Sequence, residues 1–207
     1  DLSAPPSIPQ AETGTGVILS ITPPSGEALT YTQVYEKAAP SIAALTAYSA
    51  GMVSTGTGIV LTADGYIVTN AHIIAGAEQV NVTLSDDSLW SAQLVGFEPL
   101  EDLAVLKIDA SGLTPAQFGD DTLLRSGDPV SAIGNPMGYR STITPGIVSA
   151  LDQPVSVEGT TMYLLQTSAA INYGSSGGAL LNDRGQVVGV TTIKIVADDG
   201  SAEGLGF

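Results

Sequence analysis

The stretch TGTGIVLTADGYIVT, residues 55–69, contains two apolar runs separated by a short turn-forming segment. The runs at 55–62 and 66–69 are rich in Val, Ile and Thr, which favour strands. The segment Ala63-Asp64-Gly65 between them is typical of a hairpin turn, because glycine tolerates left-handed backbone angles. The stretch therefore predicts a β-hairpin.

Similar strand-like runs continue on both sides of this hairpin. A first set also includes 42–48, 79–84, 90–97 and 103–108, and a looser stretch at 109–127 follows it. A second set covers 129–133, 143–151, 162–167, 179–181, 186–195 and 204–207, with a turn signal at 182–185. Strands and helices do not alternate regularly. We therefore expect an all-β fold of two packed six-stranded antiparallel β-barrels, barrel one at about 41–109 and barrel two at about 128–207.

The segment before the first barrel has a different composition. Residues 1–28 hold five prolines among Ser, Thr and Gly, which predicts a flexible, extended linker with at most an edge strand at 17–21. Thr30 and Gln33 then fit a capping box, so a short N-terminal helix is expected up to Pro40. A single domain, 29–207, would follow the linker.

Composition excludes several classes of function. The 207 residues include 21 acidic and 6 basic ones, a net charge of −15, which argues against nucleic acid or anionic lipid as partners. The chain has no cysteine, which excludes a thiolate nucleophile, and a single histidine, which excludes a His-rich metal cluster. No apolar run approaches the roughly 20 residues of a membrane span, and residues 1–6 do not resemble a signal peptide.

The strongest chemical motif is the glycine-rich stretch YGSSGG, residues 173–178. Glycines around a serine let the backbone turn sharply and aim two amide groups at one point, as an acyl-transfer site needs. We interpret Ser176 as a nucleophile, with the amides of Gly174 and Ser176 as the oxyanion hole. An ordinary glycine-rich turn is the alternative.

A serine nucleophile needs a base and a group that orients the base. His72 is the only imidazole in the chain and directly follows a predicted strand. Asp102 opens another, although Glu101 beside it is a rival. A lone histidine is more often structural, and a carboxylate at a strand start is more often a solvated turn residue. The chain order His, Asp, Ser is nevertheless that of the chymotrypsin-type triad, with the site between two barrels.

These motifs together resemble the HtrA (Deg) family of trypsin-fold serine proteases over about residues 31–207. The matching stretches are 56–60, 64–72, 102–108, 132–138, 146–150, 166–172, 177–180 and 204–207. The resemblance implies a cofactor-free protease that acts on unfolded or damaged proteins, usually outside the cytoplasm and often as a homotrimer. Family members usually carry one or more PDZ domains after the protease, and the chain ends before the last strand and helix of the pattern.

The chain departs from the family pattern around the expected nucleophile. Ser175 stands where the family usually has Asn, Tyr173 where Pro is common, and Ser168 where Asp is common. These differences keep a second interpretation open, in which the protein is a catalytically idle chaperone or scaffold that binds unfolded chains. A glutamate-specific secreted protease is a weaker alternative, because the single histidine is already assigned to the triad.

The resemblance also implies a specificity pocket. Its walls are expected to be formed by six uncharged residues, namely Ala170, Ile171, Asn172, Thr191, Thr192 and Ile193. Such a pocket favours Val, Ile, Leu or Ala before the scissile bond, because an unpaired cation would be costly to bury there. Lys194 is the exception to consider, since it would select acidic residues if its side chain entered the pocket.

Overall fold

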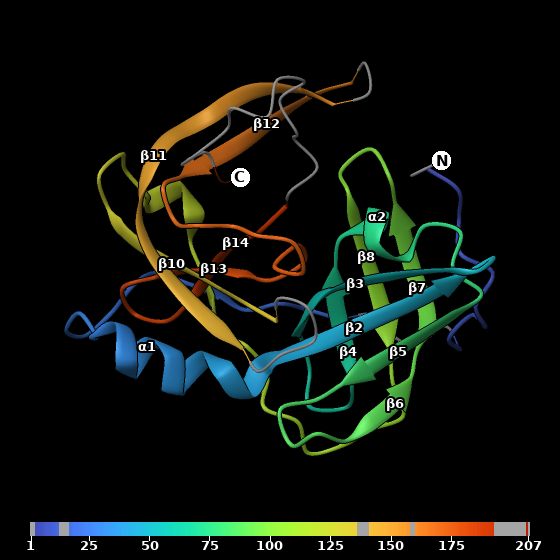
Figure 1. Ribbon diagram of the computed structural model, residues 1–207. Coiled ribbons are helices and arrows are strands. Elements are labelled where there is room, and N and C mark those ends of the chain that lie inside the picture. Colours follow the sequence, from blue (N-terminus) through green and yellow to red (C-terminus); the bar gives the residue numbers. More distant parts are fainter. Residues whose placement is uncertain (1–2, 13–16, 136–140, 158–159, 193–205, 207) are drawn as a thin grey trace.

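The computed structural model describes residues 3–12, 17–135, 141–157, 160–192 and 206, and shows two curled sheets packed side by side (Figure 1). The first sheet is fully antiparallel, in the order β6-β5-β2-β3-β4-β8-β7. Its strands are β2 (Ile42–Ser49), β3 (Met52–Val60), β4 (Tyr66–Thr69), β5 (Gln79–Thr83), β6 (Leu89–Ser91), β7 (Gln93–Glu98) and β8 (Leu103–Lys107).

The first sheet has one strand more than the sequence indicated, because the run at 90–97 is divided at Ala92. Ala92 is buried, and its N–H donates to Val80 O at 2.9 Å. On either side of it β6 pairs with β5, whereas β7 pairs with β8 at the opposite end of the strand order. The run therefore completes both ends of the sheet, with the change of partner at Ala92.

The second sheet has the order β1-β9-β14-β13-β10-β11-β12. Its strands are β1 (Ile21–Thr22), β9 (Phe118–Gly119), β10 (Pro129–Gly134), β11 (Thr142–Val157), β12 (Thr160–Thr167), β13 (Ala179–Asn182) and β14 (Val187–Val190). The expected purely antiparallel pairing is wrong at one edge, since β9 pairs in parallel with both β1 and β14. Of the last expected strand, only Gly206 is described, and it bridges Thr167.

The expected helix is present as α1 (Tyr31–Ala38), with Thr30 and Gln33 forming the capping box. A 3₁₀ turn at Ala39–Ser41 contains Pro40 and leads directly into β2. A second short 3₁₀ turn, Asp121–Leu123, precedes β10. Both predicted hairpin turns are also present, with Gly65 at φ 101° and Gly185 at φ 69°.

Three groups of buried side chains form the core. One fills barrel one, another fills barrel two, and a third lies where α1 and the two barrels meet. The third group consists of Val34, Ala38, Ile42, Ile59, Ile133, Ala179, Leu181 and Val187. Because it contains residues from both sheets, apolar burial holds the barrels together and fixes the junction at which the site lies.

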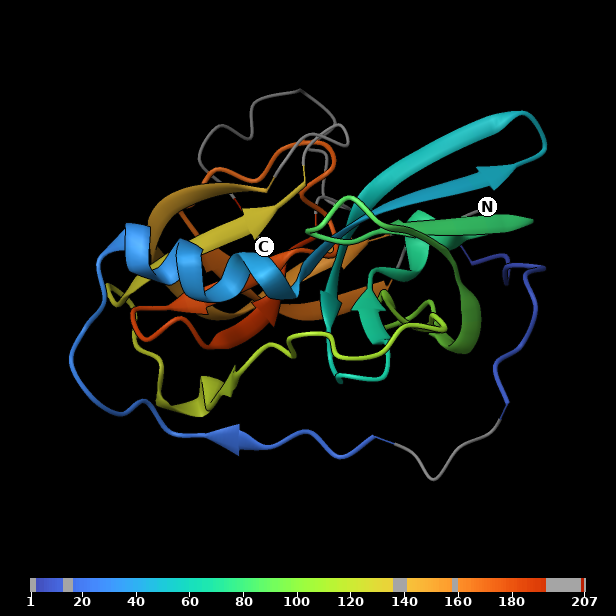
Figure 2. The ribbon, with the colours of Figure 1, turned by 90° about the horizontal axis from the view of Figure 1, so that it is seen from below.

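The N-terminal segment is extended, as expected, but its described residues are bound to both barrels. Residues 4–11, which we call the strap, lie along barrel one, while β1 adds to barrel two (Figure 2). Ser7 N–H donates to Ala77 O, and Leu94 N–H donates to Pro9 O, both at 2.8 Å. Ile8 is only 5% exposed and belongs to the core of barrel one. Ile8 and these backbone hydrogen bonds thus anchor a segment whose composition predicted a flexible linker.

None of the helices in the described parts of the chain is both long and apolar enough to cross a membrane.

Candidate active site

His72 lies in the four-residue helix α2 (Ala71–Ile74), which follows β4 directly. Asp102 lies just before β8, the strand that pairs with β4. The N–H of Ala71 and the side-chain amide of Asn70 donate to Asp102 O at 3.1 and 3.0 Å. The antiparallel pairing of β4 with β8 therefore brings together two residues that are 30 positions apart.

The side chains of His72 and Asp102 form a close pair. Nδ1 of His72 lies 2.8 Å from Oδ2 and 3.0 Å from Oδ1 of Asp102. The backbone N–H of His72 also donates to Oδ1 at 3.0 Å. The Asp102 side chain is 2% exposed and that of His72 is 19% exposed, so the imidazole reaches the surface of the junction while its partner is buried.

Two physical effects on Asp102 oppose each other. Burial alone would raise the pKa of the carboxyl group. Hydrogen bonds and electrostatic attraction from His72, together with a hydrogen bond from Thr192, outweigh burial and lower the pKa of Asp102 below its usual value. The carboxyl group is therefore ionised at neutral pH, and it accepts a hydrogen bond from Nδ1–H of His72. Asp102 has φ 53°, a left-handed conformation that Asp tolerates better than most residues.

Thr192 provides a contact that the sequence analysis did not anticipate. Its hydroxyl donates to Oδ2 of Asp102 at 3.0 Å, across 90 residues of sequence. Thr191 is placed in a similar way, with its hydroxyl donating to Ser175 O at 2.7 Å. Both threonines were expected in the specificity pocket. Their hydroxyls instead bond to the Ser175 carbonyl and the Asp102 carboxylate, which leaves only their methyl groups for the expected pocket.

The loop that carries Ser176 is shaped by glycine. Gly174 and Gly177 have φ of 89° and 82°, values that other residues rarely adopt. A Cβ on Gly177 would also collide with the carbonyl oxygen of Thr57 and come within 2.5 Å of the Thr69 hydroxyl. The glycines of the motif thus allow both the sharp turn and the close approach to barrel one, and Ser176 itself is 6% exposed.

A continuous set of contacts links this loop to the His72–Asp102 pair. Gly177 N–H donates to Thr191 O, and Thr191 N–H donates to Gly178 O, both at 2.8 Å. Thr192 follows at once and bonds to Asp102. Ser176 O accepts from Thr57 N–H on β3 at 2.8 Å, which places the serine against barrel one. The fold therefore gathers the three residues predicted from the sequence at the junction of the barrels.

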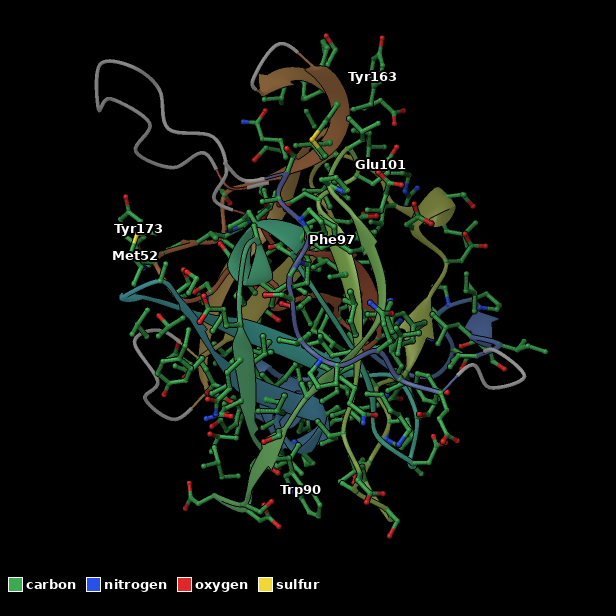
Figure 3. All side chains as sticks on the ribbon, turned by 90° about the vertical axis from the view of Figure 1, so that its right-hand side faces the viewer. Met52, Trp90, Phe97, Glu101, Tyr163 and Tyr173 are labelled. Carbon is green, nitrogen blue, oxygen red and sulfur yellow. The ribbon has the colours of Figure 1, made fainter. Side chains whose placement is uncertain are left out.

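The other candidates are placed as follows. Glu101, the rival of Asp102, is exposed, and so is Tyr173, which lies at one side of the molecule in Figure 3. Ala170 and Asn172 are exposed, and Ile171 packs partly against the core of barrel two. Ile193 and Lys194 lie outside the described residues, so their part in a pocket stays a prediction.

Metal ligands do not gather in the described part of the chain, where no three His, Asp or Glu side chains lie close enough to hold an ion. The pair and the serine loop instead have the composition of a nucleophilic site, in which an oriented imidazole activates a hydroxyl.

Comparison with known proteins agrees with this geometry. Residues 56–190 match the family described as trypsin-like peptidase domain, and the chain belongs to that family. Within it, the chain is an HtrA-type protease domain. It is 40% identical over 227 residues to the serine protease PepD of Mycobacterium tuberculosis, covering 99% of this chain and 46% of PepD.

Two further relatives cover the barrels. A DegP-like protein of Chlamydia trachomatis, named as a periplasmic serine endoprotease, is 45% identical over 156 residues, covering 73% of this chain and 30% of that protein. The structure of the HtrA-type protease AlgW with a tripeptide has a TM-score of 0.79 and 41% identity, covering 86% of this chain and 58% of AlgW. The chain spans less than half the length of the curated relatives it matches.

Proposed function

We propose that this domain is a serine endopeptidase with Ser176 as nucleophile, His72 as general base and Asp102 as the group that orients the base. The observation that carries the proposal is the bonded set His72–Asp102–Thr192 beside the Ser176 loop. Ionised Asp102 can only accept hydrogen bonds, so Nδ1 of His72 carries the proton and Nε2 keeps a lone pair for the serine proton.

The reaction then proceeds in two halves. Ser176 Oγ bonds to the substrate carbonyl carbon as its proton passes to Nε2 of His72. The carbonyl oxygen becomes an oxyanion, which the amides of Gly174 and Ser176 stabilise. The C–N bond then breaks, the amine leaves with the proton from His72, and an acyl-enzyme remains. Water repeats the sequence and releases the acid, so no metal or organic cofactor takes part.

The proposed substrates are unfolded or damaged polypeptides. An extended chain can present a residue to a pocket formed by Ala170, Ile171, Asn172, the methyl groups of Thr191 and Thr192, and Ile193. None of these residues is charged, which supports a preference for Val, Ile, Leu or Ala before the scissile bond.

The proposed location is outside the cytoplasm, in protein quality control. This proposal is supported by the name of the chlamydial relative, which includes the word periplasmic. We also propose that the protein assembles as a homotrimer and that the complete protein carries a PDZ domain. The second proposal is supported by the length of the relatives, of which this chain spans only part.

A fluorophosphonate probe tests the proposal directly. We expect it to label the wild-type chain at Ser176, with labelling and turnover of unfolded casein both lost in Ser176→Ala. Ser175→Ala is the matched control, one residue away, and should keep most of the activity. Binding of casein without turnover or labelling would instead establish the idle scaffold, and labelling at Ser175 would shift the nucleophile by one residue.

A further inference from the structure

Thr57 is a polar residue with no exposed surface in the interior of β3, and it makes four hydrogen bonds. Its hydroxyl lies 2.7 Å from Gly174 O and 2.8 Å from Asn135 N. Its backbone N–H donates to Ser176 O, and its carbonyl oxygen accepts the Thr69 hydroxyl. Thr57 therefore contacts both the first and the last residue of the Gly174–Ser176 segment, although it belongs to the other barrel.

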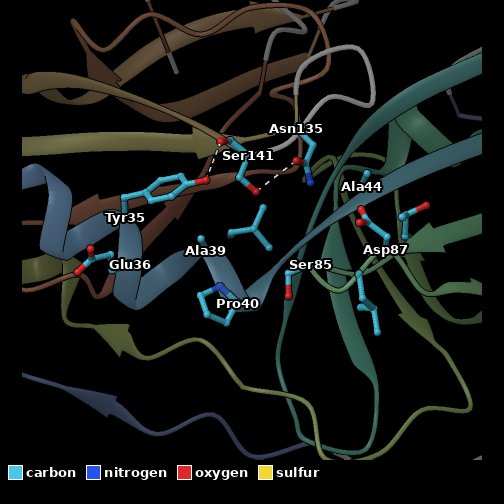
Figure 4. A pocket seen from close by; sticks show the side chains of 12 residues that line it. Tyr35, Glu36, Ala39, Pro40, Ala44, Ser85, Asp87, Asn135 and Ser141 are labelled. Atoms are coloured by element: carbon cyan, nitrogen blue, oxygen red, sulfur yellow. Dashed lines mark hydrogen bonds between the residues drawn. The ribbon is translucent and has the colours of Figure 1, made fainter.

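The direction of the hydroxyl hydrogen follows from these partners. Asn135 N–H can only donate, so the oxygen of Thr57 must accept from it. Gly174 O can only accept, so it receives the single hydroxyl hydrogen of Thr57. Asn135 itself is fixed at the wall of a pocket of about 350 Å³, where its Oδ1 accepts the Ser141 hydroxyl at 3.2 Å (Figure 4). Two partners thus define the orientation of the donor.

The next carbonyl of the loop is held in the same way from barrel two. Ser175 O accepts the Thr191 hydroxyl at 2.7 Å and Gly178 N–H at 2.9 Å. In a trans peptide the N–H points away from the carbonyl, so fixing Ser175 O also fixes the direction of Ser176 N–H. The carbonyl of Gly174 belongs to the peptide between residues 174 and 175. Fixing this carbonyl restricts ψ of Gly174, which is one of the two backbone torsions that relate this peptide to the one carrying Gly174 N–H.

We propose that Thr57 is a positioning residue of the nucleophile loop, which its hydroxyl holds in the conformation that aims the Gly174 and Ser176 amides at the substrate oxyanion. Thr191 is its counterpart, so that one threonine from each barrel holds one of two successive carbonyls. This inference rests on the proposed function. Glycine at position 174 gives the loop its turn but leaves its peptides free to rotate, and the two hydroxyls remove that freedom.

The decisive variant is Thr57→Val, which keeps the branched shape and removes the hydroxyl. Loss of a direct oxyanion donor costs about 10²–10³-fold in kcat. Because Thr57 acts one peptide away from the donors, we expect kcat on a peptide substrate to fall about 10- to 100-fold with KM within about twofold. The affinity for a peptidyl boronate, whose oxygen occupies the oxyanion hole, should fall by the same factor. Thr57→Ser should restore both.

Thr62→Val is the matched control. Thr62 lies after the same strand, and its oxygen likewise accepts a backbone N–H, that of Tyr66 at 3.1 Å. It is remote from the loop, so kcat and boronate affinity should stay at wild-type values. If Thr57→Val does not fold, Thr57→Ala can be used instead, because it leaves room for a water molecule at the hydroxyl position. It should lose less kcat than expected for Thr57→Val, again with little change in KM.

The outcomes separate this inference from the proposed function. A folded Thr57 variant with unchanged kcat, or with a change confined to KM, would overturn the positioning role. The same holds if Thr57→Ser loses as much activity as Thr57→Val, since the hydroxyl that serine keeps would then not be enough to hold the loop. Failure of the wild-type chain to react at Ser176 would instead overturn the proposed function.

Discussion

In barrel one the candidate catalytic side chains are held by hydrogen bonds to each other. In barrel two, hydrogen bonds instead hold the backbone carbonyls of the loop that carries Ser176. His72 and Asp102 bond to each other through three atom pairs closer than 3.1 Å. Around Ser176, by contrast, the carbonyls of residues 174, 175 and 176 each accept hydrogen bonds from elsewhere in the fold.

This difference indicates where each half is vulnerable. The pair in barrel one should be sensitive to the loss of one acceptor atom and tolerant of small backbone shifts. The loop in barrel two should be sensitive to one added methyl group. Variants can therefore test the comparison one barrel at a time.

The largest effect is expected in barrel one, for Asp102→Asn. An amide has one acceptor oxygen, and its NH2 group can only donate hydrogen bonds, so it favours an Nδ1 of His72 that carries no proton. The imidazole would then carry its proton on Nε2, where it cannot act as a base. We expect kcat/KM on a peptide to fall roughly 10⁴-fold, with thermal stability close to wild type.

Glu101→Gln is the matched control for this variant, because Glu101 is adjacent and exposed. It should keep wild-type kcat/KM. Loss of activity in Glu101→Gln with none in Asp102→Asn would transfer the orienting role to Glu101.

In barrel two, Gly177→Ala should disrupt the loop. The new methyl group would meet the carbonyl of Thr57, and the backbone would keep a φ unfavourable for alanine. We expect the free energy of unfolding to fall by at least about 1–3 kcal/mol and the activity to fall with it, measured by denaturant titration and peptide hydrolysis.

Gly185→Ala isolates the backbone contribution. Its φ is also positive, at 69°, but a Cβ there would meet only the flexible side chain of Lys37. It should lose about 1–2 kcal/mol and keep its activity. Equal damage in the two variants would show that the contact with Thr57 adds nothing.

A smaller effect is expected for specificity, which the proposed pocket in barrel two would determine. Cleavage profiles on denatured proteins should show Val, Ile, Leu or Ala before the scissile bond, with differences of about 10- to 200-fold per methylene. Predominant cleavage after Arg or Lys would contradict an uncharged pocket. Cleavage after Asp or Glu would indicate that Lys194 enters it.

The smallest effect is a pH dependence of stability. The pKa of Asp102 is lower in the folded chain than its usual value near 3.9, so its contribution is fully present above that value. The contribution is lost as the pH falls through the lower, folded pKa. Any stability advantage of the wild type over Asp102→Asn should thus be constant above about pH 5 and shrink below pH 4. An advantage that grew on acidification would contradict the shift.

Local patterns predicted much of this molecule. Alternating apolar residues placed most strands, and Thr30 with Gln33 placed the helix. The order of His72, Asp102 and Ser176 predicted that His72 and Asp102 meet, as they do, and the role of Ser176 stays a prediction.

The remaining features depend on contacts that leave no local signal. The hydroxyl of Thr57 reaches a carbonyl 117 residues away, and a threonine in a strand looks the same whether or not it does so. The break at Ala92 arises where the chain changes from pairing with β5 to pairing with β8. Ile8 is buried because it packs into the apolar core of barrel one. Each is decided by tertiary packing.

The strap also bears on the order in which the chain is made. Residues 4–11 are synthesised before barrel one, and their partners Ala77 and Leu94 follow about 70 to 85 positions later. The strap therefore cannot dock until most of barrel one has been synthesised. Until it docks, the outer edge of β7 is exposed and the place of Ile8 is empty. A segment made before barrel one is thus among the last parts of that barrel to fold, and its docking removes a strand edge on which nascent chains could pair.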